Sequence, residues 1–311
     1  MSISTTNAVS RELFMYRGLE ATAVDELAAQ FRGAKPFPFI QIKDFLKLSK
    51  EEAVGLFPDT EWPDWRRYHD ANNYRKMICR DIARIPPALG VLIHDLNSPA
   101  FLRFLEQITG LKALIPDPYL EGGGLHCSGP GGTLHAHSDF HQYERLHLYR
   151  RINVLLYMNE EWKQAYGGCL ELFGKGSDTP VVTVTPDWGT CVIFQTDADS
   201  VHGFSKPIVE GRWRRSIALY YYTSEESISF SGGAITHWRT NGKVAGWKQI
   251  RLHLHSGLMF GSRCFSYLAH WANPLKEPLH SRSERAEGVA DSAAKTALLI
   301  MRSEDPPSAT G

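Results

Sequence analysis

Residues 153–195 read NVLLYMNEEWKQAYGGCLELFGKGSDTPVVTVTPDWGTCVIFQ, and this stretch decides the fold class. Short runs rich in apolar, β-branched and aromatic residues alternate in it with breaks made of glycine, proline and aspartate. Such runs are typical of strands, and such breaks are typical of turns. The same pattern extends outward from Gly122 to Tyr222, and the strands that it predicts are 153–158, 168–173, 181–185, 190–195 and 214–222. Many short strands at this spacing predict a mainly β protein with an antiparallel jelly roll, or double-stranded β-helix.

The first third of the chain has helical patterning instead. Residues 21–31 carry apolar side chains at helical spacing, and residues 36–42 form an extended segment after them. Ser98 is a good N-cap and Pro99 suits the first helical position, so we expect a helix from there to Gly110, where glycine ends it. These N-terminal helices are expected to pack on one outer face of the jelly roll.

This patterning divides the chain into four regions. Residues 1–120 are expected to be a helical and strand support region within the same domain as the core. Residues 121–225 are expected to form the double-stranded β-helix itself. Residues 226–302 form a C-terminal extension whose patterning is mixed, with a short helix predicted over 284–301. Residues 303–311, which include two adjacent prolines, are expected to be a disordered tail.

The composition excludes several classes of function. Lysine plus arginine equals aspartate plus glutamate, at 34 each, so no overall basic field predicts nucleic acid or an anionic membrane as a partner. No apolar run approaches the roughly 20 residues of a membrane span, and the first ten residues are polar, so we expect a cytoplasmic protein. Five scattered cysteines without a CxxC pair predict neither disulfides nor a thiolate zinc site. Cys169 and Cys191 lie in apolar runs and are expected in the core.

The segment GGTLHAHSDFH, residues 131–141, carries the candidate metal ligands. His137 and Asp139 lie two positions apart, so on an extended segment both side chains point the same way and can meet one metal ion. His202 follows 65 positions later, after the apolar strand 191–194, and can supply a third ligand. Two histidines and one carboxylate leave several coordination positions open, which is the arrangement of non-haem iron(II) oxygenases.

Two adjacent arginines follow, twelve and thirteen positions after His202. Strand alternation puts Arg214, Ser216, Ala218 and Tyr220 on one face and Arg215, Ile217, Leu219 and Tyr221 on the other. The first face is small and polar beyond its arginine, which suits a ligand cavity, and the second is apolar, which suits core packing. An arginine can hold a carboxylate through two parallel hydrogen bonds. We therefore favour Arg214 over Arg215 as a carboxylate clamp. The alternative is that both arginines are solvated charges at the end of a strand.

Together these segments resemble a known family. The series His137-x-Asp139, His202 and Arg214-x-Ser216 is similar to the motif series of the 2-oxoglutarate/iron(II) dioxygenases. The runs NVLLYMNEEW (153–162) and GGCLELF (167–173) resemble strands of the prolyl-4-hydroxylase-like branch, which includes the animal hypoxia-sensing prolyl hydroxylases and their bacterial relatives. The resemblance extends over residues 37–223.

The resemblance implies a reaction and a set of roles. His137, Asp139 and His202 would hold iron(II), while Arg214, Tyr157 and Ser216 would contact the co-substrate 2-oxoglutarate. The implied reaction uses O₂, hydroxylates an unactivated C–H bond and releases succinate and CO₂, with ascorbate as a candidate reductant. Asp139 favours hydroxylation over halogenation, since a small residue there would open a halide site.

The substrate stays open at this point. Ala218 stands where the hypoxia-sensing enzymes can carry a polar residue, and the segment after Tyr222 has no counterpart in the resemblance. A peptidyl proline, another protein side chain and a free small molecule are all compatible with the motifs. The aromatic region 230–271 could form a lid, a homodimer surface or ordinary packing.

Two other classes of protein compete with this reading. A cupin-type metalloenzyme that uses no 2-oxoglutarate would share the jelly roll and could use His135 with His137 as a His-x-His pair. Cupins place a glutamate four or five positions later, where this chain has His141 and Gln142, and Glu144 is too distant. A non-catalytic binding module with the same barrel is the third reading, against which the complete set of ligands argues.

Overall fold

The computed structural model describes residues 21–47, 49, 51, 55–68, 73–225, 236–238, 254 and 258. The chain divides into two compact units, Met1–Gly242 and Lys243–Gly311, and the helices and strands discussed below belong to the first. The helix predicted over 284–301 and the tail 303–311 lie outside the described residues. Among the described residues, no helix is both long and apolar enough to cross a membrane.

The described elements up to residue 109 include both helices and strands. After that residue they are strands, interrupted by one 3₁₀ turn. The helices are α2 (Ala21–Gly33), α3 (Pro87–Leu96), α4 (Pro99–Thr109) and the 3₁₀ turn η1 (Gln164–Tyr166). The strands are β1 (Phe39–Ile42), β2 (Arg66–Tyr68), β3 (Asn73–Cys79), β4 (Ile115–Pro116), β5 (Gly124–Ser138), β6 (Gln142–Tyr143), β7 (Leu148–Tyr157), β8 (Leu170–Phe173), β9 (Pro180–Val184), β10 (Cys191–Gln195), β11 (His202–Phe204), β12 (Arg214–Thr223) and β13 (His237–Trp238).

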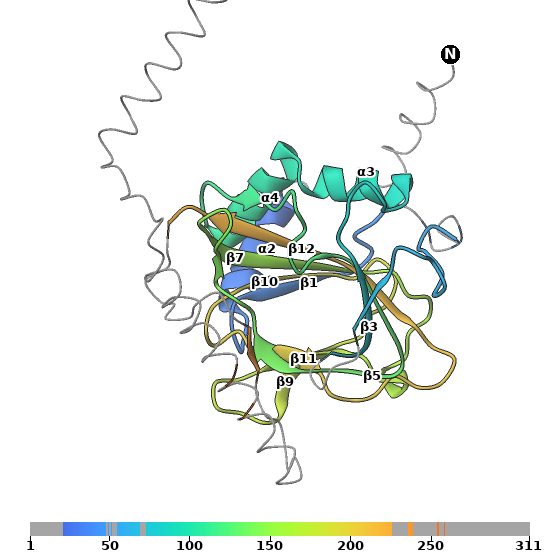
Figure 1. The fold of residues 1–311 in the computed structure, drawn as a ribbon. Coiled ribbons are helices and arrows are strands. Elements are labelled where there is room, and N and C mark those ends of the chain that lie inside the picture. Colours follow the sequence, from blue (N-terminus) through green and yellow to red (C-terminus); the bar gives the residue numbers. More distant parts are fainter. Residues whose placement is uncertain are drawn as a thin grey trace, which may run out of the picture. The chain divides into compact units, whose positions relative to one another are not determined.

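The strands form a double-stranded β-helix, as the sequence predicted. Within the described residues hydrogen bonds join 13 strands, along the main path β1-β10-β7-β12-β5-β11-β8-β9. The strand pairs are antiparallel throughout this path. The path folds over at the β12–β5 junction, so that β1, β10, β7 and β12 form one layer and β5, β11, β8 and β9 the opposite one (Figure 1).

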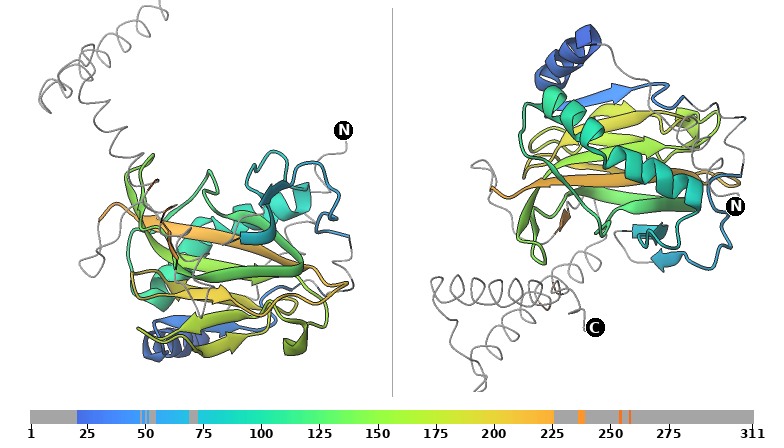
Figure 2. Two further views of the ribbon diagram at one scale, coloured as in Figure 1. Left: turned by 60° about the horizontal axis from the view of Figure 1, so that its bottom comes forward. Right: turned by 90° about the horizontal axis from the view of Figure 1, so that it is seen from above.

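The N-terminal helices cover the outer face of the first layer (Figures 1 and 2). The core between helices and sheet contains buried side chains from both, among them Leu89, Leu92, Phe101, Leu105, Ile152, Val154, Cys191, Ile193, Ile217, Leu219 and Tyr221. Ser98 begins α4, because its side chain accepts a hydrogen bond from the Phe101 amide, and Gly110 ends it with φ 76°. Both positions agree with the predicted helix ends, and the packing confirms that the helices lie on one outer face of the jelly roll.

Strand β12 has the two faces that its alternation predicted. Ile217, Leu219 and Tyr221 pack in the core beneath the helices. Arg214, Ser216 and Tyr220 line a cavity between the two layers instead. Because side chains alternate strictly along a strand, the apolar residues that anchor the strand also fix Arg214 on the inward face.

Strand β5 is the longest of the described strands, and the sequence pattern did not predict it as one strand. Its first part pairs with β12 and its last part with β11, so it belongs to both layers. The bend between these parts is the run Gly129-Pro-Gly-Gly132, in which Gly131 has φ 74°. A Cβ at Gly132 would lie 2.7 Å from the Gly129 carbonyl oxygen, so the backbone can turn this tightly only with glycine there.

A short strand beyond the predicted core returns to this element. β13 pairs with the end of β5 with His237 opposite Ser138 and Trp238 opposite His137. Strand β11 pairs with the same stretch of β5, with His202 opposite His137. The backbone that carries His137 is therefore flanked by a strand on each side.

The hydrogen bond from the Tyr221 hydroxyl to the Leu96 carbonyl, at 2.6 Å, links the sheet to the end of α3. We expect Tyr221→Phe to lower the free energy of unfolding by about 1–3 kcal/mol, because the buried carbonyl loses its partner. Urea denaturation would measure this change. Tyr119→Phe is the control, since Tyr119 is 46% exposed, and an equal effect of both substitutions would contradict the assigned role.

Candidate active site

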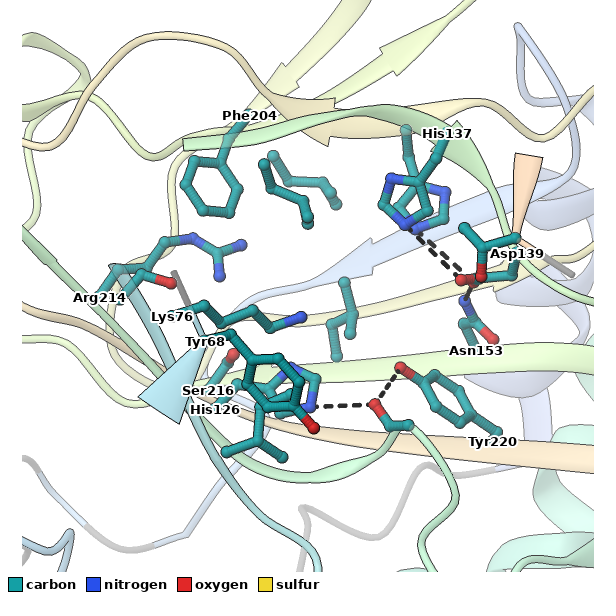
Figure 3. Close-up of a pocket in the computed structure, with 18 of the residues that line it drawn as sticks. Tyr68, Lys76, His126, His137, Asp139, Asn153, Phe204, Arg214, Ser216 and Tyr220 are labelled. Atoms are coloured by element: carbon teal, nitrogen blue, oxygen red, sulfur yellow. Dashed lines mark hydrogen bonds and ion pairs between the residues drawn. The ribbon is translucent and has the colours of Figure 1, made fainter. Parts of the chain in front are cut away.

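A cavity of about 230 Å³ lies between the two layers of the sheet (Figure 3). One part of its wall holds His137, Asp139 and His202, and another holds Arg214 and Ser216. These residues come from β5, the turn after it, β11 and β12, which are far apart in sequence. The jelly roll therefore brings five of the residues singled out in the sequence to one enclosed space.

Three of these residues form a compact group of potential metal ligands. One donor atom from each of His137, Asp139 and His202 lies within 4.8 Å of the others. Asp139 Oδ1 is 3.6 Å from His137 Nε2, and Asp139 Oδ2 is 3.7 Å from His202 Nε2. Both histidines are 6% exposed, so the group is shielded from bulk water. It arises because β11 pairs with β5 so that His202 stands opposite His137.

Backbone carbonyls orient both imidazoles. His137 Nδ1 donates to the His135 carbonyl at 2.8 Å, and His202 Nδ1 donates to the Ser200 carbonyl at 3.1 Å. A carbonyl only accepts, so the proton lies on Nδ1 and the lone pair of each Nε2 is left for a metal. Metal-bound histidines in proteins are commonly fixed in this way. Burial, together with His202, lowers the pKa of His137 to about 3, so this ring is neutral at neutral pH.

Asp139 is held as a carboxylate by its neighbours. Burial alone would raise its pKa, but Arg150 and the nearby histidines outweigh that effect and hold the pKa well below its usual range. Arg150 Nη1 lies 3.0 Å from Asp139 Oδ2, and Asn153 Nδ2 donates to the same oxygen at 2.5 Å. The carboxylate is thus charged and oriented before any metal binds.

Arg150 and Asn153 were not identified from the sequence. The Arg150 guanidinium is 1% exposed and lies 4.0 Å from the ring centre of Phe140 and 3.5 Å from that of Tyr220. Asn153 was assigned only to a strand. Arg150 and Asn153 lie three positions apart on β7, so strict alternation would place them on opposite faces of the strand. A register shift in the pairing of β7 with β12 next to Arg150 accompanies the placement of both side chains at the cavity, and no sequence pattern signals that shift.

Arg214 is buried at the opposite part of the cavity. Its Nε donates to the Gly168 carbonyl at 2.7 Å, and its Nη2 donates to the Tyr157 hydroxyl at 3.1 Å. Its guanidinium also lies 4.6 Å from the ring centre of Phe204. These contacts fix the plane of the guanidinium and still leave donors for a carboxylate. Ser216 lines the cavity two residues further on, whereas Tyr157 is fully buried behind Arg214.

The other motif residues support Arg214 from outside the cavity. The Asn159 side chain accepts from the Arg215 amide at 2.6 Å and donates to the Arg215 carbonyl at 3.0 Å, which ties β12 to the end of β7. The Trp162 indole donates to the Gly167 carbonyl at 2.9 Å and so anchors the loop that receives Arg214. Arg215 itself is not among the described residues that line the cavity.

Neighbouring histidines have other surroundings. His141 is 1% exposed and packs against Tyr149, so it is buried. His135 does not belong to the group of potential ligands found among the described residues, which the His-x-His pair of a cupin would require. His126 lines the cavity.

Residues 123–222 match the model of the 2OG-Fe(II) oxygenase superfamily. This stretch of the chain is a 2OG-Fe(II) oxygenase domain. The match begins beside the first residue of β5 and ends within β12, so the domain includes the potential metal ligands and Arg214. The resemblance deduced from the motifs is therefore confirmed.

Relatives of the oxygenase domain include prolyl hydroxylases. The prolyl 3-hydroxylase OGFOD1 of Xenopus laevis is 28% identical over 192 residues, which is 60% of this chain and 34% of the relative. The prolyl 3,4-dihydroxylase OGFOD1 of Ostreococcus tauri is 26% identical over 211 residues, which is 62% of this chain and 39% of the relative. The chain thus spans about a third of the length of these curated relatives. A crystal structure of a Pseudomonas putida prolyl-4-hydroxylase is 20% identical with a TM-score of 0.40, covering 63% of this chain and 98% of that one.

The residues of the oxygenase domain fit the metal and co-substrate in the family's name. Two imidazoles and one carboxylate with donor atoms within 4.8 Å of one another are the donor set that suits iron(II) with open positions. The buried guanidinium of Arg214, elsewhere in the same cavity, suits the far carboxylate of 2-oxoglutarate. The cavity therefore provides for the iron(II) and the 2-oxoglutarate predicted from the sequence.

Buried neutral histidines predict how the stability of the metal-free protein depends on pH. Burial lowers the pKa of His126 well below its ordinary value, as it does for His137. Below pH 6.5 each of the two histidines is protonated in the unfolded chain only. The free energy of unfolding should therefore fall by about 1.4 kcal/mol for each histidine with every unit by which the pH is lowered. Denaturation in EDTA between pH 7 and pH 5 would measure this loss.

The matched variant is His126→Gln, which keeps a neutral polar side chain but cannot be protonated. We expect it to reduce the slope of stability against pH by the share of one histidine, about 1.4 kcal/mol per pH unit. His94→Gln is the control, because His94 is exposed on α3. A slope that His126→Gln leaves unchanged would show that His126 is protonated in the folded state too.

Proposed function

We propose that this chain is an iron(II)- and 2-oxoglutarate-dependent hydroxylase in which His137, Asp139 and His202 hold the metal. The observation that carries the proposal is the group of three donor atoms within 4.8 Å, set in the same cavity as the buried Arg214. The match of residues 123–222 to the 2OG-Fe(II) oxygenase superfamily supports it. When bound, iron(II), 2-oxoglutarate and O₂ supply the oxidising chemistry, with release of succinate and CO₂.

The roles of the protein's own residues follow from their positions. His137 and His202 offer nitrogen donors, and Asp139 offers a charged oxygen that Arg150 and Asn153 orient. Arg214 and Tyr157 are proposed to hold the far carboxylate of 2-oxoglutarate, and the Tyr157 hydroxyl also accepts a hydrogen bond from the Arg214 guanidinium. Ser216 lies beside this carboxylate on the same strand face. Burial of the whole set excludes water and strengthens each electrostatic contact.

The substrate in this proposal is a prolyl residue or another molecule derived from an amino acid. Both curated relatives are named as prolyl hydroxylases, and both align with about three-fifths of this chain. A peptide and a free small molecule remain the two forms in which such a group could reach the site. Ascorbate is the proposed reductant in activity assays. We also propose that the protein is cytoplasmic and that it forms a homodimer.

We also propose that residues 121–225 form the catalytic core and residues 1–120 support it within one domain. The contacts of α3 and α4 with β7, β10 and β12 in a shared core support this division. Residues 226–302 would be an extension, of which Thr236 lines the cavity and β13 pairs with β5. The tail 303–311 completes the proposed organisation.

The first test removes one proposed ligand. We expect His202→Ala to abolish succinate formation from 2-oxoglutarate and to lose stoichiometric Mn(II) binding, because two remaining ligands hold a divalent ion poorly. Calorimetry with Mn(II) gives a readout that does not depend on turnover. His94→Ala should bind metal as the wild type does, since His94 is exposed on α3. Retention of metal by His202→Ala would contradict the proposed site, and tight metal binding unaffected by 2-oxoglutarate would favour a cupin-type enzyme.

The second test compares the two adjacent arginines. Arg214→Lys should weaken 2-oxoglutarate binding to the Mn(II)-loaded protein by about tenfold or more, because lysine cannot form two parallel hydrogen bonds. Arg215→Lys should change the Kd by less than about twofold, since Arg215 lies on the other face of β12. Fluorescence or calorimetric titration gives both values. The opposite ranking would refute the assignment of Arg214.

A further inference from the structure

A row of four residues crosses four neighbouring strands along one wall of the cavity. Arg214 of β12 pairs with Ser128 of β5, Ser128 pairs with Lys76 of β3, and Lys76 pairs with Tyr68 of β2. Residues directly opposite one another in a sheet point to the same face. All four line the cavity, and Figure 3 shows the Lys76 side chain extending into it.

In this row Arg214 of β12 and Lys76 of β3 are separated by one strand, β5. Neighbouring strands are about 4.8 Å apart, so the backbone of Lys76 lies about 10 Å from that of Arg214, with Ser128 between them. Under the proposed function Arg214 takes the far carboxylate of 2-oxoglutarate. Lys76 and Tyr68 then line the part of the wall that extends away from the co-substrate.

Three cationic side chains line the cavity among the described residues, and each has a different place in it. Arg150 lies 3.0 Å from Asp139, beside the potential metal ligands. Arg214 lies where the far carboxylate of 2-oxoglutarate is proposed to bind, and Lys76 lies two strands further along the wall. An ammonium group at that place attracts a carboxylate by its charge.

Strands β2 and β3 lie outside the stretch that the superfamily model matches. That match starts at residue 123, whereas β2 and β3 span Arg66–Tyr68 and Asn73–Cys79. The metal ligands and Arg214 come from the matched stretch, and the wall with Lys76 and Tyr68 comes from outside it. The proposed metal ligands and the proposed clamp for 2-oxoglutarate therefore lie on other segments of the chain than Lys76 and Tyr68.

We propose that Lys76, with Tyr68 beside it, forms a subsite that binds a carboxylate of the substrate. This inference rests on the proposed function, because it places the substrate beside the co-substrate in the same cavity. A lysine ammonium is a point charge with three donors that can follow a carboxylate by rotating its stem. Both residues are half-buried, so the contact would form partly away from water, where it is stronger. The substrate class is therefore an amino-acid derivative with a carboxylate near the carbon that is hydroxylated.

The test measures binding to the protein loaded with Mn(II) and 2-oxoglutarate, so that no turnover is needed. Two matched pairs of probes differ only in charge. N-acetyl-L-proline and N-acetyl-L-prolinamide test a carboxylate on the proline itself, and N-acetyl-prolyl-aspartic amide and N-acetyl-prolyl-asparagine amide test one on a neighbouring residue. We expect the wild type to prefer the acid of at least one pair by roughly tenfold or more. The pair that shows the preference identifies the source of the carboxylate.

Three variants separate the charge from the fold. Lys76→Met, which keeps an unbranched side chain, should remove the preference for the acid, and Lys76→Arg should retain it in part. Lys112→Met is the matched control, because Lys112 is exposed in the segment after α4 and should keep the full preference. Thermal denaturation of each variant checks that the fold is intact. Lys76→Met should leave the Kd for 2-oxoglutarate within about twofold of the wild type, unlike Arg214→Lys.

Three results would overturn the subsite. The wild type could bind neither acid better than its amide, which includes the case in which no probe binds. Lys76→Met could keep the preference, or it could weaken 2-oxoglutarate as much as Arg214→Lys does, which would assign Lys76 to the co-substrate. A wild-type protein that fails to bind Mn(II) or 2-oxoglutarate would instead contradict the proposed function, so the two failures are distinguishable.

Discussion

The site depends on one register in the sheet, the pairing of β11 with β5 that sets His202 opposite His137. A shift by one residue would turn either imidazole to the other face of its strand, and the group of three donors would no longer exist. Gly203 shows how close the two strands are, because a Cβ there would lie 2.7 Å from the Leu134 carbonyl oxygen. The close approach and the register together make the site a property of the sheet rather than of a loop.

A buried ion pair lies beside the potential metal ligands before any ligand binds. Asp139 is a buried carboxylate, and Arg150 is a buried guanidinium at 3.0 Å from it. Breaking such a pair by removing one partner typically costs about 3–5 kcal/mol, because the other charge stays buried alone. The rings of Phe140 and Tyr220 enclose the same guanidinium from its faces. The oxygen that Arg150 and Asn153 share on Asp139 is thereby kept in one orientation.

Much of this was predictable from the sequence, because it depends on local periodicity. Alternation along 214–222 correctly separated the cavity face from the core face, and Ser98 and Gly110 marked the ends of α4. Other features depend on contacts between distant segments. Arg150 and Lys76 reach the cavity only through the pairing of β7, β5 and β3 with their neighbours, and no short motif marks them. Strand β5 was missed because Gly129–Gly132 has the composition of a turn while its pairing partners hold it in the sheet.

The position of β13 has a consequence for where the catalytic part of this molecule ends. A protein shortened after residue 225 would keep all three potential metal ligands and Arg214. It would lose β13, however, and the backbone at His137 and Ser138 would become an unpaired sheet edge. Unpaired edges of this kind pair with strands of other chains, so a shortened protein would tend to self-associate beside its own metal site. His237 and Trp238 cover this edge beside the potential metal ligands, and Thr236 lines the cavity next to them. All three residues lie beyond residue 222, where the match to the superfamily ends.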